Sequence, residues 1–195
     1  MNAPVPPPND IVSHLRASAA VIEAAIGHFS DDRVERAALM CADALRANRP
    51  VLVCGNGGSA SDAQHITGEL VGRFLKERRA LNAICLSANT SVLTAWANDY
   101  AYDTVFSRQV EAHGTAGGVL LGLSTSGNSG NVVKAAEAAR KLGMGVVMLT
   151  GEGGGKLAAL SDILLDAPSK STPLIQQVHI CLYHHLCERI EQLCL

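Results

Sequence analysis

The chain alternates short apolar runs with longer segments in which apolar residues recur every three or four positions. The runs are too short for helices, and the first is rich in β-branched residues, so they predict buried strands. They lie at 51–54, 81–86, 118–123, 145–149 and 163–165. Strand and helix repeated in this order predict a parallel sheet with right-handed crossovers and helices on both faces.

Helical periodicity fills the segments around these runs, and two of the helices precede the first strand. The earlier one begins after Asp10, which can cap it, and the later one spans about 31–48. Together they predict a helical hairpin ahead of the sheet. Its apolar residues can pack on the sheet or form a surface for other subunits, and the sequence leaves both possibilities open. Further helices are predicted at 59–74, 90–97, 102–112, 132–142, 156–160 and about 172–193.

Composition narrows the class of protein. The chain has 195 residues, 48% of them hydrophobic, which suits one domain at 10–195 after a flexible, proline-rich segment at 1–9. A net charge of −2 and 4% aromatic residues argue against binding to nucleic acid. No apolar run approaches about 18 residues and no signal pattern is present, so a cytoplasmic protein without membrane association is expected. The six cysteines form no Cys-x-x-Cys pair and are expected to be buried and reduced.

The first strand is followed by Gly-Asn-Gly-Gly at 55–58, and Ser59 is predicted to cap the next helix. Free backbone N–H groups at a helix start attract anions, so this turn is a candidate anion site. Farther along the helix, His65, Glu69 and Arg73 are spaced by four residues and share one face. Such a face can carry acid–base or metal chemistry, or it can be a solvated surface. Nucleotide binding is disfavoured, because no acidic residue ends the second strand.

A second polar turn, at 124–130, follows the third strand. Four hydroxyl side chains and a helix start can surround a phosphate without any lysine. An ordinary capping turn needs fewer hydroxyls, so phosphate binding is favoured. Ligands of parallel sheets bind at the carboxyl ends of strands, so the turns at 55–59 and 124–130 are expected to lie together. The hydroxyl residues are Ser124, Thr125, Ser126 and Ser129.

The C-terminal helix carries Gln176, His179, His184 and His185. Eight residues correspond to about 80° of helical rotation, so Gln176 and His184 share a broad face. His185 lies about opposite Gln176, and rotation alone does not exclude His179. A single histidine on a helix is more often a packed or solvated side chain than a catalytic one.

Four motifs in this order, together with Glu69, resemble those of the sugar isomerase (SIS) family, and within it those of the phosphoheptose (sedoheptulose 7-phosphate) isomerases. The resemblance extends from about residue 10 to the C-terminus. It implies a flavodoxin-like three-layer α/β sandwich with a parallel five-stranded sheet, an N-terminal helical hairpin and a long C-terminal helix. The motifs are GNGGSASDAQH at 55–65, Ala-Asn-Asp-Tyr at 97–100, Ser-Thr-Ser-Gly-Asn-Ser at 124–129 and Thr-Pro-x-Ile-Gln-x-x-His at 172–179.

The resemblance implies an aldose–ketose isomerase that converts sedoheptulose 7-phosphate to D-glycero-D-manno-heptose 7-phosphate through an enediol. This is the first step towards the heptose precursors of lipopolysaccharide core or capsule. The reaction needs a base that moves a proton between adjacent carbons and an acid that serves the two oxygens, and we assign these roles to Glu69 and His184. The substrate-binding residues implied are Asn56, Gly57, Gly58, Ser59, Glu69, Asn98, Asp99, Ser124, Thr125, Ser126, Ser129 and Gln176.

The resemblance also implies one zinc ion (Zn²⁺) per subunit, not obligatory in every member, with His65, Glu69, Gln176 and His184 as its ligands. A carboxylate bound to zinc is a weaker base, so Glu69 would need to leave the metal or use its second oxygen. A homotetramer with active sites between subunits is implied as well. Arg73 can tune Glu69, touch substrate or form a solvated salt bridge, and Gln177 stands where relatives often carry Glu.

A second function is compatible with the same fold. It is that of a non-catalytic SIS-fold binding protein, like the one associated with the bacterial replication initiator. That relative lacks the glutamate on the helix, whereas Glu69 and His184 are both present here, which favours an enzyme. A regulatory sugar-phosphate sensor would be expected to bring a DNA-binding domain, for which these 195 residues leave no room.

Overall fold

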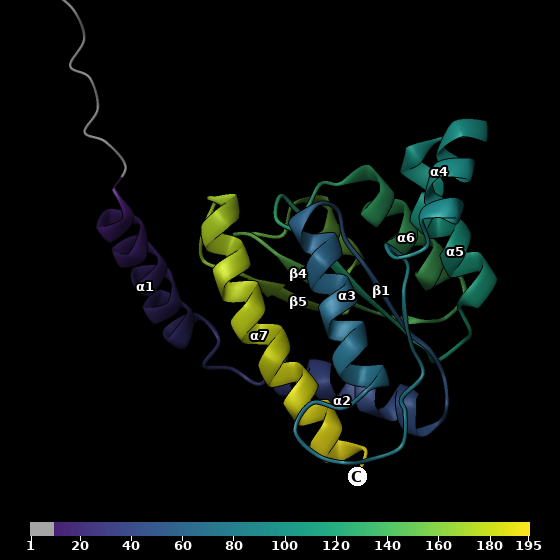
Figure 1. Ribbon diagram of the computed structural model, residues 1–195, viewed down its shortest axis with the longest axis horizontal. Coiled ribbons are helices and arrows are strands. Elements are labelled where there is room, and N and C mark those ends of the chain that lie inside the picture. Colours follow the sequence, from purple (N-terminus) through teal and green to yellow (C-terminus); the bar gives the residue numbers. More distant parts are fainter. Residues whose placement is uncertain (1–9) are drawn as a thin grey trace, which may run out of the picture.

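The computed structural model describes residues 10–195, and a single parallel sheet lies between its two layers of helices (Figure 1). The strands follow the order β2-β1-β3-β4-β5, and every neighbouring pair is parallel. The predicted five-stranded sandwich is therefore confirmed. The flexible segment expected at 1–9 lies outside the described residues. The strands are β1 (Val51–Cys54), β2 (Ala83–Cys85), β3 (Val119–Ser124), β4 (Gly145–Thr150) and β5 (Ile163–Asp166).

Both faces of the sheet are covered, which explains why its strands read as continuous apolar runs. Every residue of β1 and β3 is buried. Neighbouring side chains on a strand point to opposite faces, so Val51 and Val53 join one core while Leu52 and Cys54 join the other. The first core lies under α2 (Arg33–Arg46), α3 (Gly58–Val71) and α7 (Thr172–Leu193), and the second under α5 (Val105–His113) and α6 (Gly130–Lys141).

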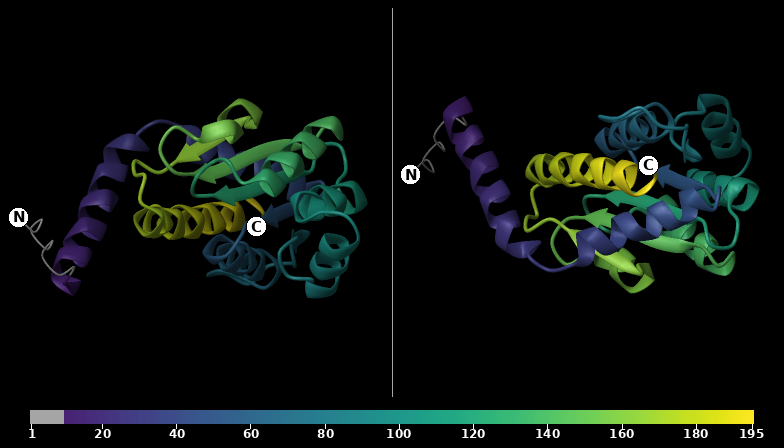
Figure 2. Two further views of the ribbon diagram at one scale, coloured as in Figure 1. Left: turned by 90° about the horizontal axis from the view of Figure 1, so that it is seen from above. Right: turned by 90° about the horizontal axis from the view of Figure 1, so that it is seen from below.

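The N-terminal helix α1 (Ile11–His28) starts as predicted at Asp10, whose carboxylate accepts a hydrogen bond of 2.7 Å from the backbone N–H of Ser13. α2 packs on the sheet, whereas α1 extends past the edge of the body and contacts α7 (Figure 2). The two predicted helices are thus present, but they diverge instead of lying along each other. Several apolar side chains of α1 remain exposed, namely Ile11, Val12, Leu15, Ile22 and Ile26.

The N-cap of helix α3 lies two residues earlier than predicted. It is Gly57, at φ +56°, and not Ser59, which is buried inside the first turn and makes no capping bond. A glycine adopts this backbone conformation without strain. The chain therefore turns from β1 directly into the helix before a capping serine is reached.

Helix α3 ends at Val71, before the predicted end at Phe74. Glu191 of α7 accepts hydrogen bonds from the backbone N–H groups of Phe74, Leu75 and Lys76, at 2.8, 2.8 and 2.9 Å. In a longer helix these N–H groups would bond to carbonyls of the preceding turn. Gly72, the C-cap of α3, marks this end locally, and a carboxylate distant in sequence binds the N–H groups that follow it.

The remaining elements differ from the predictions at their ends or in helix type. α4 (Thr90–Asp99) continues through Asn98 and Asp99, beyond its predicted end at Ala97. The helix predicted from Tyr102 divides into a short 3₁₀ turn, η1 (Tyr102–Thr104), followed by α5. A second 3₁₀ turn is η2 (Gly155–Leu160). No helix among the described residues combines the length and apolar character that a membrane span requires.

Candidate active site

The turn between β3 and α6 gathers the predicted hydroxyl groups. The Oγ atom of Ser124 lies 2.8 Å from that of Ser129 and 3.5 Å from that of Ser126. Ser129 is the N-cap of α6, yet its side chain makes no capping bond. The start of α6 and the hydroxyls therefore offer hydrogen-bond donors to an anion. Thr125 links this turn to α7 through a contact of 3.5 Å with Thr172.

The two polar turns are joined directly, as predicted from the parallel sheet. Nδ2 of Asn56 donates to Oδ1 of Asn131 at 2.8 Å, and Nδ2 of Asn131 donates back to Oδ1 of Asn56 at 2.9 Å. The hydroxyl of Tyr102 donates to the same Oδ1 of Asn56 at 2.8 Å. Asn56 therefore fixes the relative position of both turns. Sequence reasoning missed Asn131 and Tyr102, although Asn131 directly follows the hydroxyl motif.

The first polar turn also touches α7. Gly57 and Gly58 are exposed. A Cβ atom on Gly58 would lie only 2.4 Å from Nε2 of Gln176. The first turns of α3 and α7 therefore approach each other closely, although the contact is with the tip of a flexible side chain that could move aside. Gln176 therefore lies beside the anion-binding end of α3.

Asn98 and Asp99 are exposed on the last turn of α4, at one end of the molecule (Figure 1). Nδ2 of Asn98 donates to Oδ1 of Asp99 at 2.9 Å. Within the described chain, neither side chain bonds to either polar turn. Hydrogen bonds within this chain therefore do not hold Asn98 and Asp99 in place for the predicted contact with the sugar.

Helices α3 and α7 run side by side on one face of the sheet and bring the predicted catalytic residues together (Figure 1). Nε2 of His65 lies 3.1 Å from Oε1 of Glu69, one turn further along α3. The rings of His65 and His184 meet edge to face, with centroids 5.1 Å apart. Glu69 and His184 thus meet at His65, although they are far apart in sequence. The side chains of His65 and Glu69 are 44% and 23% exposed, so a ligand can reach them.

Gln176 does not join this cluster. It lies two turns before His184 on α7, which is about 12 Å along the helix axis. The predicted zinc ligands are therefore divided in this chain between the neighbourhood of His65 and the start of α3. Among the described residues, no three His, Cys, Asp or Glu side chains are close enough together to enclose a metal ion.

The donors themselves suit zinc, because imidazole, carboxylate and amide oxygens are all ligands that it accepts. Nε2 of His65 and Oε1 of Glu69 face each other at 3.1 Å. Two acceptors at this distance need a proton or a cation between them. Two of the four predicted ligands thus already converge, while the remaining positions are not closed within one chain.

His65 is held on its other side by two residues that the sequence analysis missed. Nδ1 of His65 lies 3.1 Å from the hydroxyl of Tyr183, which donates to Oδ1 of Asp62 at 3.4 Å. Burial, followed by the charge of Asp62, raises the pKa of Tyr183, so the phenol stays protonated. Burial also raises the pKa of Asp62, against the opposing effects of Tyr183 and His65. Nothing in the sequence marks Tyr183 except its position next to His184.

The far end of the α3–α7 pair holds a second glutamate. Glu191 is 1% exposed, and its Oε1 lies 3.5 Å from Nε of Arg78, whose side chain is 2% exposed. Arg78 also donates to the carbonyls of Glu69, at 2.7 Å, and Gly72, at 2.9 Å. Burial alone would raise the pKa of Glu191, but the three backbone N–H bonds and Arg78 outweigh it and hold the pKa below its usual range.

Three further candidates from the sequence occupy other environments. Arg73 forms an exposed ion pair with Glu77, in which Nε lies 3.0 Å from Oε1. Of the three roles considered for Arg73, this contact is the solvated salt bridge. His179 is fully buried and donates from Nε2 to the carbonyl of Thr150 at 3.0 Å, and burial lowers its pKa to about 4. His185 is exposed and lines the groove between α1 and α7. None of the three hydrogen-bonds to the His65 cluster in the described part of the chain.

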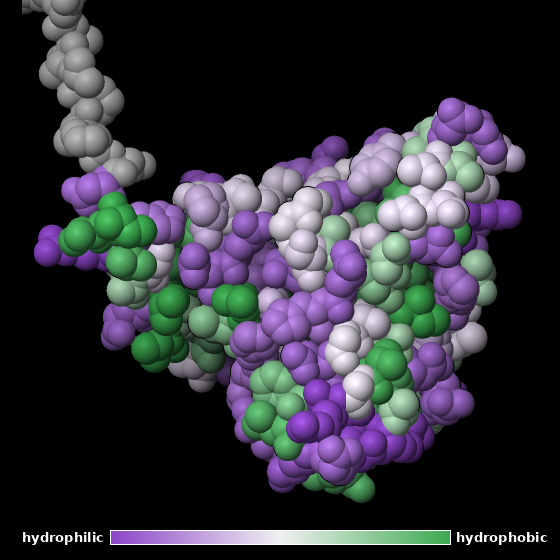
Figure 3. Space-filling view, viewed as in Figure 1, coloured by the Kyte–Doolittle hydropathy of each residue, from purple (hydrophilic) through white to green (hydrophobic). Residues whose placement is uncertain are grey.

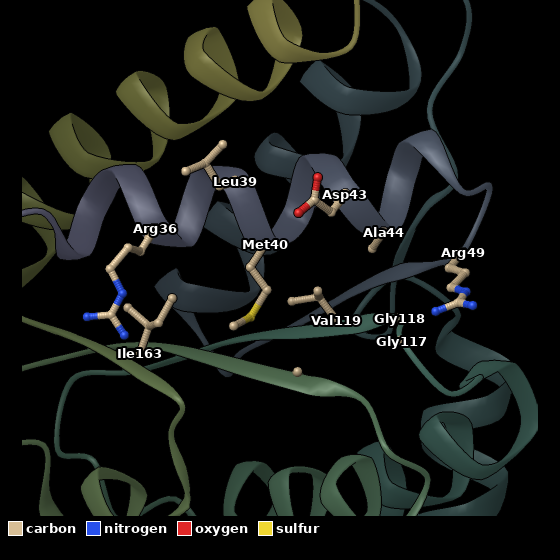
Figure 4. A pocket seen from close by; sticks show the side chains of 11 residues that line it. Arg36, Leu39, Met40, Asp43, Ala44, Arg49, Gly117, Gly118, Val119 and Ile163 are labelled. Atoms are coloured by element: carbon tan, nitrogen blue, oxygen red, sulfur yellow. The ribbon is translucent and has the colours of Figure 1, made fainter.

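Two cavities help to delimit the site. One of about 390 Å³ lies between the first turns of α3 and α7, and Gly58, Asp62 and Gln176 are among its lining residues. A larger one, of about 490 Å³, lies under α2 at the opposite edge of the sheet, where Val119 and Gly145 begin their strands (Figure 4). No predicted site residue lines the larger cavity. We therefore assign the candidate site to the carboxyl edge of the sheet and the α3–α7 pair.

Comparison with known proteins identifies the family of this chain. A family model described as SIS domain matches residues 12–151. A phosphoheptose isomerase from Rhodospirillum rubrum is 55% identical over 158 residues, which is 81% of this chain and 84% of the relative. Another, from Geobacter sp. (strain M21), is 49% identical over 183 residues, 94% of this chain and 95% of the relative.

A solved structure extends this likeness to three dimensions. The phosphoheptose isomerase from Neisseria gonorrhoeae matches with a TM-score of 0.87 at 42% identity, covering 93% of this chain and 97% of that one. Likeness at this level covers the sheet and the helices on both of its faces. The chain therefore belongs to the SIS-domain family, and within it to the phosphoheptose isomerases.

Proposed function

We propose that this chain is an aldose–ketose isomerase that interconverts sedoheptulose 7-phosphate and D-glycero-D-manno-heptose 7-phosphate, at the start of heptose precursor synthesis for lipopolysaccharide core or capsule. Its relatives support the reaction, because those that match most of the chain are phosphoheptose isomerases by name. The observation that carries the proposal is the meeting of Glu69 and His184 at His65. An acid and a base placed together can move a proton between neighbouring carbons.

Glu69 is the proposed base. Its Oε1 faces His65, and among the described residues its Oε2 makes no hydrogen bond. Oε2 can therefore take a proton from C1 of the ketose and return it to C2. His184 is the proposed acid: it gives a proton to the oxygen on C2 and takes one from the oxygen on C1. The enediol is the species between these two exchanges.

The hydroxyl turn is the proposed phosphate site. Ser124, Thr125, Ser126 and Ser129 supply hydroxyl groups, and the start of α6 supplies backbone N–H groups. The absence of a lysine from the motif does not prevent binding, because oriented neutral donors stabilise an anion as well. The phosphate would hold one end of the substrate while its other end reacts.

The distance between these two parts supports an active site shared between subunits. Glu69 follows Gly58 by 11 residues (69 − 58), which is about 16 Å along α3 from its start. C1 and C7 of an extended heptose are only about 8 Å apart, at roughly 1.5 Å per bond. Glu69 thus lies farther along α3 from its start than the carbon chain of one heptose is long, which supports a contribution from a neighbouring subunit. We propose a homotetramer in which a neighbouring subunit completes each site.

Exposed apolar surface supports such an assembly. Apolar side chains gather over α1 and the adjoining side of α7 (Figure 3). A groove of about 280 Å³ lies between these helices and is lined by Ile22, Ile26 and Val178 among others. Contiguous apolar surface of this kind is typical of contact between subunits. Measurement of the molecular mass in solution tests this part of the proposal.

Zinc is proposed as a non-obligatory cofactor, one ion per subunit, with His65, Glu69, Gln176 and His184 as ligands drawn from more than one subunit. The convergence of His65 and Glu69 supports this. Bound there, the ion would polarise the carbonyl and hydroxyl oxygens of the substrate. Glu69 could then act through Oε2 while Oε1 faces the metal.

A cytoplasmic location is proposed from the cysteines. All six lie in the described part of the chain and are free thiols. Cys41, Cys54 and Cys187 are buried as predicted, and burial raises the pKa of each thiol to about 12. Cys181, in contrast to the prediction, is exposed. Free thiols are typical of a reducing compartment.

The alternative of a non-catalytic binding protein gains no support. The relatives that match this chain over most of its length carry an isomerase name. The chain also keeps both Glu69 and His184, and the fold brings them to one cluster. A protein that only binds a sugar phosphate has no need of an acid and a base placed together.

The proposed reaction is tested by incubating the purified protein with sedoheptulose 7-phosphate in D₂O, with and without a chelator, and following the aldose by NMR. An enediol and a solvent-exchanging base predict deuterium at C2 of the product. Aldose with only substrate hydrogen at C2 would indicate a hydride shift instead. No aldose under either condition would overturn the function, and activity that survives the chelator would show that zinc is not obligatory.

A further inference from the structure

Tyr183 and Asp62 lie behind His65 and have no role in the reaction described above. Tyr183 is 1% exposed and directly precedes His184 on α7. The hydroxyl of Tyr183 lies 3.4 Å from Oδ1 of Asp62 and 3.1 Å from Nδ1 of His65. From Nε2 of His65 the line of polar atoms continues to Oε1 of Glu69 at 3.1 Å. Four side chains from two helices thus form one connected row.

The direction of each bond in this row follows from counting protons. Tyr183 has one hydroxyl proton, and an ionised carboxylate can only accept, so the proton goes to Asp62. If Tyr183 gave it to His65 instead, both oxygens of Asp62 would lack a donor, because Oδ2 is buried and has no partner among the described residues. Leaving a buried acceptor without a donor is costly. The oxygen of Tyr183 therefore accepts a hydrogen bond from Nδ1–H of His65.

We propose that Asp62 and Tyr183 are positioning residues that keep the proton of His65 on Nδ1 and present the lone pair of Nε2, together with Oε1 of Glu69, to a zinc ion. This inference rests on the proposed zinc site and extends it to two residues that do not touch the metal. Histidine ligands in proteins commonly donate their second N–H to a carboxylate or a carbonyl. Here the carboxylate of Asp62 acts on His65 through a tyrosine.

Ring packing makes the hydroxyl of Tyr183 separable from the rest of its side chain. The ring meets that of His65 at a centroid distance of 5.4 Å and that of His184 at 4.9 Å, both edge to face. A phenylalanine keeps these contacts. Tyr183→Phe therefore removes only the atom that joins Asp62 to His65.

The test measures Zn²⁺ binding by competition with a chromophoric chelator. We expect Tyr183→Phe to weaken Zn²⁺ binding on the order of tenfold or more. Asp62→Asn should also weaken it, but it should have no further effect in the Tyr183→Phe background, because the connection is already broken. Thr67→Val is the matched control: Thr67 lies on α3 with Asp62 and His65, and its hydroxyl bonds to the carbonyl of Ala63. This control should bind Zn²⁺ like the wild type.

A spectroscopic measurement gives a second readout that does not depend on activity. In zinc-loaded protein with ¹⁵N-labelled histidine, the protected Nδ1–H of His65 should give a resolved proton resonance, assigned by its loss in His65→Gln. This resonance should disappear or move in Tyr183→Phe and persist in Thr67→Val. A purely structural role of Tyr183 would leave it unchanged once folding is intact.

The outcomes separate this inference from the proposals on which it rests. Wild-type protein that binds no Zn²⁺ overturns the zinc site and the inference together, while the assay in D₂O decides the isomerase function separately. Wild-type protein that binds Zn²⁺, with Tyr183→Phe binding it within twofold and with the same resonance, overturns only the positioning role. Equal effects of Asp62→Asn in both backgrounds would also overturn it. If Tyr183→Phe fails to fold, Asp62→Asn carries the same measurements.

Discussion

Two glutamates on the α3–α7 pair occupy opposite chemical situations. Glu191 is 1% exposed, and its carboxylate accepts three backbone N–H bonds beside Arg78. The Glu69 side chain is 23% exposed, faces one imidazole and keeps one oxygen without a partner in the described part of the chain. A carboxylate whose hydrogen-bonding capacity is filled stabilises the fold. One whose capacity is left open remains available for chemistry.

The two situations are connected through Arg78. Its guanidinium pairs with Glu191 and also donates to the backbone carbonyl of Glu69 at 2.7 Å. By pairing with Arg78, the carboxylate of Glu191 thereby fixes the end of α3 from which Glu69 projects. Substituting each glutamate in turn is therefore the most direct test of the difference between them.

Glu69→Gln should have the largest effect. An amide cannot take the proton from C1, so kcat should fall about 10³-fold, equivalent to about 4 kcal/mol. The melting temperature should change little, because Glu69 is partly exposed. Turnover of sedoheptulose 7-phosphate and thermal melting measure the two quantities. Turnover that stays within tenfold of wild type would contradict the assignment of Glu69 as base.

Glu191→Gln should show the reverse pattern. The amide has one acceptor oxygen instead of two and leaves Arg78 buried without its countercharge. We expect the free energy of unfolding to fall by about 3 kcal/mol, with turnover preserved where the protein remains folded. Urea unfolding measures the loss, and the amide protons of Leu75 and Lys76 should exchange faster. An unchanged urea midpoint would mean that the buried carboxylate does not stabilise the fold.

His179 is intermediate between Glu191 and Glu69, since its side chain is buried but its Nδ1 has no hydrogen-bond partner among the described residues. Its pKa is about 4 in the folded chain against 6.5 ordinarily, so the unfolded chain binds more protons between these values. Stability is therefore complete above pH 6.5 and is lost as the pH falls towards 4, by about 2 kcal/mol between pH 7 and pH 5.

His179→Gln tests this predicted pH dependence of stability. Glutamine can still donate to the carbonyl of Thr150 but cannot be protonated in this range. The contribution of residue 179 to the pH dependence should therefore vanish, and urea unfolding of both proteins at pH 7 and pH 5 measures it. Equal losses of stability in wild type and variant would contradict the lowered pKa of His179.

Ser129→Ala tests whether the hydroxyl groups of the turn at 124–130 also have hydrogen-bonding capacity left for a ligand. Ser129 makes no capping bond, so its substitution removes only the bond to the Ser124 hydroxyl, and the free energy of unfolding should fall by about 1 kcal/mol. Loss of one bond to a phosphate should raise KM about tenfold, or about 1.4 kcal/mol, with kcat nearly unchanged. Initial rates measure this. Ser161→Ala is the control, since that hydroxyl bonds to the carbonyl of Leu157 outside the site, and an equal effect of both substitutions would remove the special role of Ser129.

Arg73→Ala should have the smallest effect. The pair of Arg73 with Glu77 is exposed, and such pairs contribute about 0.5 kcal/mol or less. Melting temperature and turnover should both stay close to those of wild type. A large fall in turnover would instead mean that Arg73 acts on Glu69 or on the substrate in the assembled enzyme.

The sheet and the turns at its carboxyl edge could be predicted because their causes are local. Apolar runs such as Val51–Cys54 can only be buried strands in this context, and parallel strands carry their functional turns to one edge. The predicted proximity of the two polar turns is confirmed by the paired amides of Asn56 and Asn131. The family resemblance supplied Glu69 and His184, and the helix pair brings them to one place.

The remaining features depend on partners that are distant in sequence. The N–H groups that follow the end of α3 bond to Glu191, which is 117 positions away from Phe74. Tyr183 reaches His65 across 118 positions. Helical periodicity records which face of a helix is apolar, but it does not record which polar group another helix will offer. The role of Glu191 beyond α3 and the residues behind His65 therefore required the three-dimensional structure.

The missing side chain at Gly58 has a mechanical consequence for the helix pair. A methyl group there would press on Gln176, because a Cβ atom would lie 2.4 Å from its Nε2. The other end of the pair is fastened by Arg78 and Glu191. A bulkier residue at position 58 would first displace the amide end of Gln176, which is the tip of a flexible side chain. The room left at this one position therefore lets a side chain of α7 lie against the first turn of α3.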